Sequence, residues 1–158
     1  IIVTLNVIKM NVKEVSAKWF EVTITYDSVT ENGETKKVAE VVTINAMSFA
    51  EAESKALEEY ACIATGDTDV TAIKIAKYGS VFIPQDNTVV PTFYNIKLAF
   101  ITLDEKTEKE KRTNVQYLVG ASNFEDARKT IEKVMNPGMI DYVFVGVTES
   151  KVVEVYSE

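Results

Sequence analysis

The chain has 158 residues, of which 46% are hydrophobic and 26% are charged, with only six Gly and three Pro. This composition is typical of one soluble globular domain, or of two small half-domains that share a core, and nothing in it suggests disorder. The net charge of −7 argues against bulk attraction to nucleic acid or anionic lipid, although it leaves room for a local basic groove.

The chain contains no His and a single Cys. Without His, the commonest general base, the commonest zinc ligand and every His-activated nucleophile are excluded. Cys62 excludes an internal disulfide and is expected to be a small buried hydrophobe within a helix. No apolar run reaches the ~18 residues of a membrane span. We therefore expect a cytoplasmic protein that is not an enzyme and has no membrane partner and no cofactor.

Residues 1–17 precede the repeated part of the chain. Ile1 to Val7 alternate apolar and polar residues, which predicts a short strand. Met10 is a plausible natural start, so residues 1–9 are either an upstream extension or the first part of an incomplete chain.

The first repeat spans residues 18–83. Strict alternation predicts a strand from Trp19 to Tyr26, and Glu31-Asn32-Gly33 predicts the turn into a returning strand over 36–45. Ser48, with Glu51 three residues later, has the pattern of a capping box that begins a helix running to about residue 63. The helix is expected to bury Phe49 among other apolar residues, and a closing strand follows over 70–78.

The second repeat spans residues 92–158, after a linker at 84–91, and follows the same plan. The segment 120–127 repeats the pattern of 45–52, with Asn123 in the capping position of Ser48 and Phe124 in the place of Phe49. Strands are expected over 93–103, 112–120 and 142–147, and a charged hairpin loop over 104–111. Residues 152–156 are expected to continue the last strand or to pair beside it.

Two ββαβ units predict about six strands and two helices. We expect an α+β fold of one compact domain, with mainly antiparallel sheet, both helices packed on one face, and pseudo-twofold symmetry between the units.

The face of the strands that points away from the helices carries an unusual mixture of aromatic, basic and amide side chains. Trp19 and Phe93 occupy matching positions in the two repeats, and so do Lys37 and Arg112. Aromatic side chains stack on unpaired bases, and Lys or Arg contacts the phosphates. The residues predicted to bind single-stranded nucleic acid are Trp19, Lys37, Lys74, Phe93, Lys97, Arg112, Tyr142 and Phe144, with Asn95, Asn114 and Gln116 on the same face.

The aromatic residues of this face, the helical Glu cluster and the charged run each have an explanation that needs no ligand. The exposed aromatic residues could instead be covered by the N-terminal strand, by the linker or by a second subunit, and cross-strand aromatic pairs stabilise sheets without a ligand. Glu51, Glu53, Glu58 and Glu59 are expected to be a solvated helix face, with a carboxylate-only metal site as the open alternative. The charged run over 104–112 is expected to be a solvated hairpin tip.

Several of these segments resemble a family of uncharacterised proteins that occurs in Bacteroidales, their mobile elements and crAss-like phages. The resemblance spans about residues 18–155 and is looser in the helical part of the second repeat. It rests on Trp19-Phe20-Glu21-Val22, Tyr26, Glu31-Asn32-Gly33, Lys36-Lys37-Val38, the segment 46–53, the segment 100–106 and Lys111-Arg112-Thr113. The resemblance implies a DNA-associated role in a bacterial host cell, and no catalytic activity comes with it.

We therefore expect a non-catalytic single-stranded-DNA-binding accessory protein of a phage or mobile element. The alternative is a protein interaction or assembly module, for example a phage structural or adaptor protein, whose unusual face forms a homo-oligomer interface and does not bind nucleic acid.

Overall fold

The computed structural model describes residues 12–16, 18–64, 66–85, 90–136, 138 and 140–157. The chain divides into two compact units instead of the single domain expected. The four-strand unit comprises residues 17–76 and 151–158, and the five-strand unit comprises residues 1–16 and 77–150. The strand predicted over residues 1–7 lies outside the described residues.

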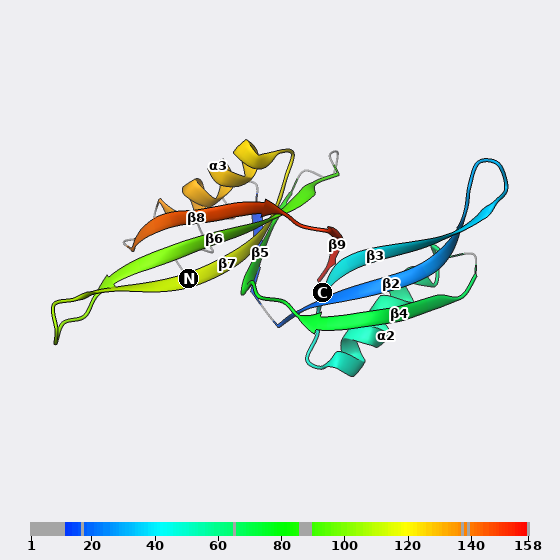
Figure 1. Cartoon of the computed structure of the whole chain (residues 1–158), viewed down its shortest axis with the longest axis horizontal. Coiled ribbons are helices and arrows are strands. Elements are labelled where there is room, and N and C mark those ends of the chain that lie inside the picture. Colours follow the sequence, from blue (N-terminus) through cyan, green and yellow to red (C-terminus); the bar gives the residue numbers. More distant parts are fainter. Residues whose placement is uncertain are drawn as a thin grey trace. The chain divides into compact units, whose positions relative to one another are not determined.

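The four-strand unit contains a sheet of order β4-β2-β3-β9 and one helix. Its elements are β2 (Trp19–Val29), β3 (Thr35–Asn45), α2 (Phe49–Tyr60), β4 (Thr68–Ile75) and β9 (Val152–Tyr156). Gly33, with a φ of 80°, forms the predicted turn between β2 and β3. Figure 1 shows α2 against one face of this sheet, where the alternate β2 residues Phe20, Val22 and Ile24 form a core with Ala52 and Ala56.

The five-strand unit contains a sheet of order β1-β5-β7-β6-β8 and the second helix. Its elements are β1 (Val12–Ser16), β5 (Ser80–Pro84), β6 (Thr92–Leu103), β7 (Glu110–Ala121), α3 (Phe124–Met135) and β8 (Asp141–Glu149). The core beneath α3 joins Ile96 and Leu98 of β6 to Ala127 and Ile131 of the helix. The expected α+β class with mainly antiparallel sheet is confirmed. The strands form two sheets, and each sheet has its own helix instead of both helices sharing one face.

Both helices begin at the residues that the sequence predicts. The Ser48 hydroxyl oxygen accepts a hydrogen bond from the Glu51 N–H at 3.1 Å, and the Asn123 side-chain oxygen accepts one from the Asp126 N–H at 2.9 Å. The Glu51 carboxylate in turn accepts from the Met47 N–H at 3.2 Å. The capping residues are therefore confirmed in both repeats, with Met47 as the reciprocal donor in the first.

The Phe residues at the start of the helices are less buried than expected. Phe49 is 49% exposed and Phe124 is 51% exposed. Each ring instead covers the edge of the sheet core by contacting an aromatic residue near the start of a strand. Phe49 meets Phe20 at a centroid distance of 5.1 Å, and Phe124 meets Tyr94 at 4.8 Å.

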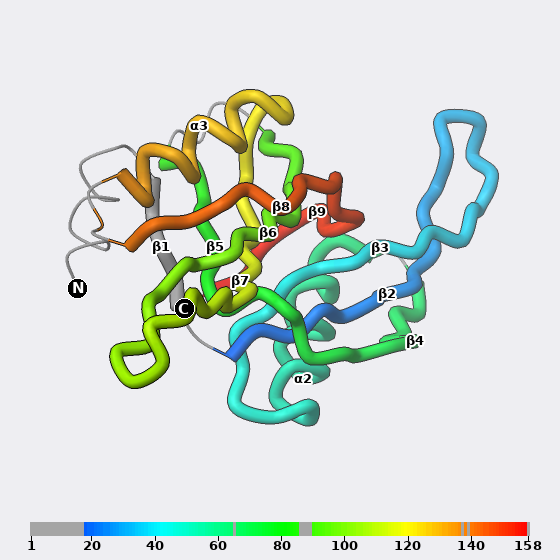
Figure 2. The backbone as a smooth tube through the Cα atoms, turned by 60° about the vertical axis from the view of Figure 1, so that its left-hand side comes forward, coloured from blue at the N-terminus to red at the C-terminus, as the bar shows by residue number. Residues whose placement is uncertain are grey.

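The two short strands β5 and β9 are exchanged: each one joins the sheet of the opposite repeat. β5 lies at the end of the first repeat, but it pairs in parallel with β7 of the second. β9 lies at the end of the second repeat, but it pairs in parallel with β3 of the first, instead of lying beside β8. Figure 2 traces β5 beside β7 and β9 beside β3. The predicted boundary at 83/84 therefore differs from the structural units, because residues 77–84 and 151–156 complete the opposite sheets.

A carboxylate holds two tyrosines in the core of the four-strand unit. Glu40 on β3 accepts hydrogen bonds from the Tyr26 hydroxyl at 2.9 Å and from the Tyr60 hydroxyl at 2.5 Å. Burial and these bonds raise the pKa of Tyr60 strongly, and the pKa of Tyr26 is raised for the same reasons. The arrangement satisfies a charged group beside the core and ties β3 to β2 and α2.

Candidate nucleic-acid interface

The two residues expected to stack on bases are buried. Trp19 and Phe93 are each 2% exposed, so the expectation that they lie free on the sheet surface is wrong. They do occupy matching positions: the Trp19 carbonyl accepts from the Ala76 N–H at 2.9 Å, and the Phe93 carbonyl accepts from the Ser150 N–H at 2.8 Å. Alternation assigns a residue to a face of the sheet, but it does not tell whether another segment covers that face.

Tyr142 and Phe144 lie on the helix side of the five-strand sheet, so their expected placement on the opposite side is also wrong. They lie opposite Phe100 and Leu98 of β6 and pack against the core under α3. A bulge opposite Lys97 and Leu98 shifts the register of β8 and moves these side chains to the other face. The Arg128 guanidinium lies 5.5 Å from the centroid of the Phe144 ring, which is an intramolecular cation–π contact.

The two predicted lysines of the four-strand unit have acidic neighbours. The Lys74 ammonium lies 3.2 Å from the Glu21 carboxylate, whose side chain is only 14% exposed. Lys37 is exposed, but it lies directly opposite Asp27 across β2 and β3. Neither lysine therefore presents an isolated positive charge to a ligand.

Lys97 and Arg112 remain on the outer side of the five-strand sheet, as predicted. Lys97 lies opposite Gln116, and Arg112 lies two residues before Asn114 on β7. Lys97, Arg112 and Asn114 are exposed and Gln116 is half-buried; we call these four residues the polar face. The Arg112 guanidinium lies 3.5 Å from the Glu110 carboxylate, an exposed contact that water and salt screen easily.

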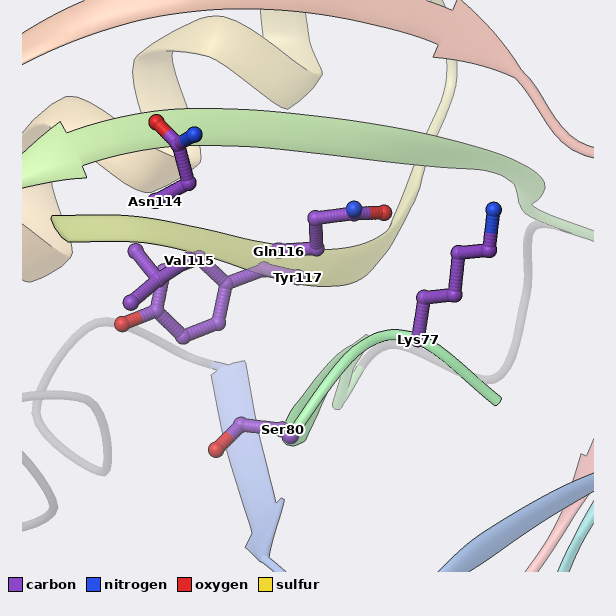
Figure 3. A pocket seen from close by; sticks show the side chains of 7 residues that line it. Lys77, Ser80, Asn114, Val115, Gln116 and Tyr117 are labelled. Carbon is purple, nitrogen blue, oxygen red and sulfur yellow. The ribbon is translucent and has the colours of Figure 1, made fainter. Parts of the chain in front are cut away.

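A pocket opens beside the polar face, at the point where β5 begins. Its volume is about 360 Å³, and its walls come from Lys77, Gly79, Ser80 and residues 114–117 of the five-strand unit. Figure 3 shows Lys77, Asn114 and Gln116 pointing to one side of β7, and Val115 and Tyr117 pointing to the other. Lys77 was missed because the strand predicted over 70–78 placed it on the inward side, with Ile73 and Ile75, whereas β4 ends at Ile75.

The other repeat provides an internal comparison for the polar face. The registers of the two sheets place Thr23 opposite Val41, where the five-strand unit has Lys97 opposite Gln116. They likewise place Ala39 at the position of Asn114. One fold is therefore built with small or apolar residues at these positions in one unit and with polar residues in the other. The polar side chains are thus not required by the fold.

The two units also differ in charge. The four-strand unit has six Lys against thirteen Asp and Glu, and the five-strand unit has eleven basic against eleven acidic residues. The whole net charge of −7 therefore belongs to the four-strand unit. The five-strand unit, which carries the polar face, is neutral overall, whereas the four-strand unit is acidic.

The thiol and the carboxylates first considered for chemistry belong to the four-strand unit. Cys62 is exposed and follows the end of α2, so the expectation of a buried thiol inside a helix is wrong. Within the described residues, no three or more Asp, Glu, Cys or His side chains come together as a metal site. In the same part of the chain, neither helix has the length and apolar character that crossing a membrane requires.

Comparison with known proteins identifies a family. No curated protein matches the chain, and no solved structure matches it. The model of one protein family, described as a domain of unknown function (DUF4494), matches residues 18–158. That match covers both repeats and both exchanged strands. The chain therefore belongs to the DUF4494 family.

Proposed function

We propose that this chain is a non-catalytic single-stranded-DNA-binding protein and that the DNA lies across the polar face of the five-strand unit. The observation that carries the proposal is the comparison between the repeats: Lys97, Asn114 and Gln116 replace Thr23, Ala39 and Val41 at positions where the fold accepts either set. The resemblance to proteins of Bacteroidales mobile elements and phages supports an accessory role in DNA metabolism, in the cytoplasm of the bacterial host.

Phosphate contacts carry the affinity in this proposal, because Trp19 and Phe93 are buried. Lys97, Arg112 and Lys77 contact phosphates, and the Asn114 and Gln116 amides hydrogen-bond to the sugars or bases. For single strands, each phosphate that the protein neutralises contributes about −0.7 to the slope of log K against log salt concentration. Three cationic contacts therefore predict a slope of about −2.

A fluorescence anisotropy titration of labelled oligo-dT at several salt concentrations tests the proposal. The matched variant carries Lys97→Thr, Asn114→Ala and Gln116→Val, which gives the five-strand unit the residues of the other repeat. We expect this variant to keep its thermal unfolding midpoint and to lose most of its affinity. Absence of wild-type binding at micromolar protein in low salt would contradict the proposal.

A second candidate, an assembly module, is favoured by the edge strand β8. Val143 is 39% exposed and Val145 is 53% exposed, and β8 has no strand on its outer side in the described part of the chain. Unpaired edges of this kind accept a strand from another molecule. Light scattering distinguishes the candidates: a stable homo-oligomer that ignores oligo-dT and dissociates on Val145→Lys supports assembly and contradicts DNA binding.

A further inference from the structure

Strand β7 has a free edge for about half of its length. β5 pairs with it only from Tyr117 to Val119, although β7 begins at Glu110. The last main-chain contact runs from the Gly79 N–H to the Gln116 carbonyl, at 3.3 Å. Before this point, no strand in the described part of the chain pairs with the outer edge of β7.

The alternation of a strand shows which main-chain groups face this free edge. Because the Gln116 carbonyl points outward, the main-chain groups of Asn114 and Arg112, two and four residues earlier, point to the same side. Each of these residues offers an N–H donor and a C=O acceptor next to each other. The pocket of about 360 Å³ opens along this edge, between Asn114 and Lys77.

We infer that this pocket binds one unpaired nucleobase through the hydrogen-bonding edge of the base. The inference rests on the proposed function and adds the group that recognises the strand. A base carries donors and acceptors in its plane, as the edge of β7 does, and a volume near 360 Å³ lies at the small end of ligand pockets. The Lys77 ammonium, on the same side of the pocket, contacts the adjoining phosphate.

This arrangement explains selectivity for single strands without exposed aromatic residues. In a duplex, the hydrogen-bonding edge of each base is occupied by its partner, so only an unpaired base presents these groups to β7. Base pairing and the free strand edge therefore compete for the same donors and acceptors.

The corresponding position in the other repeat suggests a variant that closes the pocket. A Cβ added at Gly79 meets no atom within 4 Å, so a larger side chain is accommodated there at the cost of pocket space. In the other exchanged strand, Glu154 lies opposite Val42 as Ser80 lies opposite Tyr117, and the two residues before Glu154, at the register shift, are Val152 and Val153. Gly79→Val thus introduces a residue that the fold already accepts and leaves Lys97 and Arg112 in place.

The test compares three labelled ligands of equal length: oligo-dT, an abasic deoxyribose-phosphate chain, and a duplex. We expect oligo-dT to bind about fivefold or more tightly than the abasic chain, which corresponds to one or more net hydrogen bonds, with an equal salt slope. Gly79→Val is expected to reduce oligo-dT affinity to that of the abasic chain. A thermal melt verifies that the variant is folded.

The outcomes separate the inference from the proposed function. Equal wild-type affinity for oligo-dT and the abasic chain overturns the base pocket and leaves phosphate binding intact, and this comparison needs no variant. Duplex binding as tight as oligo-dT binding also overturns the pocket. Failure to bind any of the three ligands overturns the proposed function itself.

Discussion

Phe82 and Tyr156 occupy the same position in two different sheets. Phe82 of β5 lies opposite Val119 of β7, and Tyr156 of β9 lies opposite Ile44 of β3. Val119 and Ile44 are equivalent in the two repeats, since each lies one residue before the position paired with Phe93 or Trp19. Each repeat therefore supplies an aromatic residue that completes the core of the other repeat.

The exchanged aromatic residues predict a ranking of stabilities. Phe82 is 1% exposed, so Phe82→Ala is expected to lower the free energy of unfolding by about 3–5 kcal/mol. Tyr156 is only partly buried, so Tyr156→Ala is expected to cost less. Urea unfolding followed by circular dichroism measures both, with the half-exposed Val153→Ala as the control. A loss below about 1 kcal/mol for Phe82→Ala would show that β5 contributes little to its sheet.

Trp19 is predicted to stabilise the folded protein instead of contacting DNA. Trp19→Ala is expected to lower the free energy of unfolding by about 3–5 kcal/mol, because the side chain is 2% exposed. Its Nε1–H has no hydrogen-bond partner among the described residues, so Trp19→Phe removes an unsatisfied donor and is expected to cost less. Circular dichroism melts measure both variants. A Trp19→Ala protein that melts like the wild type but binds DNA weakly would instead make this residue a ligand contact.

Tyr60 predicts a loss of stability at alkaline pH. Burial, together with the hydrogen bond to Glu40, raises the pKa of Tyr60 above its ordinary value of 10.0. A raised folded-state pKa leaves stability unchanged below pH 10.0 and lowers it above, because only the unfolded chain loses the proton there. Urea unfolding from about pH 9 to about pH 11 should show a steeper decline for the wild type than for Tyr60→Phe. Parallel declines would contradict this assignment.

Substitutions of Lys37 and Lys97 are expected to differ in their effect on DNA binding. Lys97→Ala is expected to reduce the salt slope for oligo-dT by about 0.7, because one phosphate contact is lost. Lys37→Ala is expected to leave the slope unchanged, because Lys37 lies opposite Asp27 in the acidic unit. Anisotropy titrations of the two single variants in parallel provide the comparison. Equal losses would extend the binding surface to the four-strand unit.

Local signals predicted most of the repeated plan. The caps at Ser48 and Asn123 and the turn at Gly33 depend on residues a few positions apart, and each was predicted correctly. The exchange of β5 and β9 could not be predicted, because parallel pairing with a distant strand has no short-range pattern.

The candidate site was harder to predict than the fold. Lys97 and Arg112 were assigned to the correct face, because β6 and β7 alternate without interruption. Tyr142 and Phe144 were assigned to the wrong face, because one extra residue in β8, between Phe144 and Gly146, reverses the alternation on its two sides. The burial of Trp19 depends on coverage, which a strand's own sequence does not encode.

The exchange of β5 and β9 has a consequence for any shorter ancestor of this chain. In the present pairing, the short strand after each ββαβ unit joins the sheet of the other unit. A chain with only one such unit would therefore have no sheet for its short strand to join. Two separate copies would have to trade strands, so the ancestral assembly would be an intertwined homodimer. Joining the genes end to end would turn that dimer into a single polypeptide, freeing one half to acquire a ligand while the other kept the architecture.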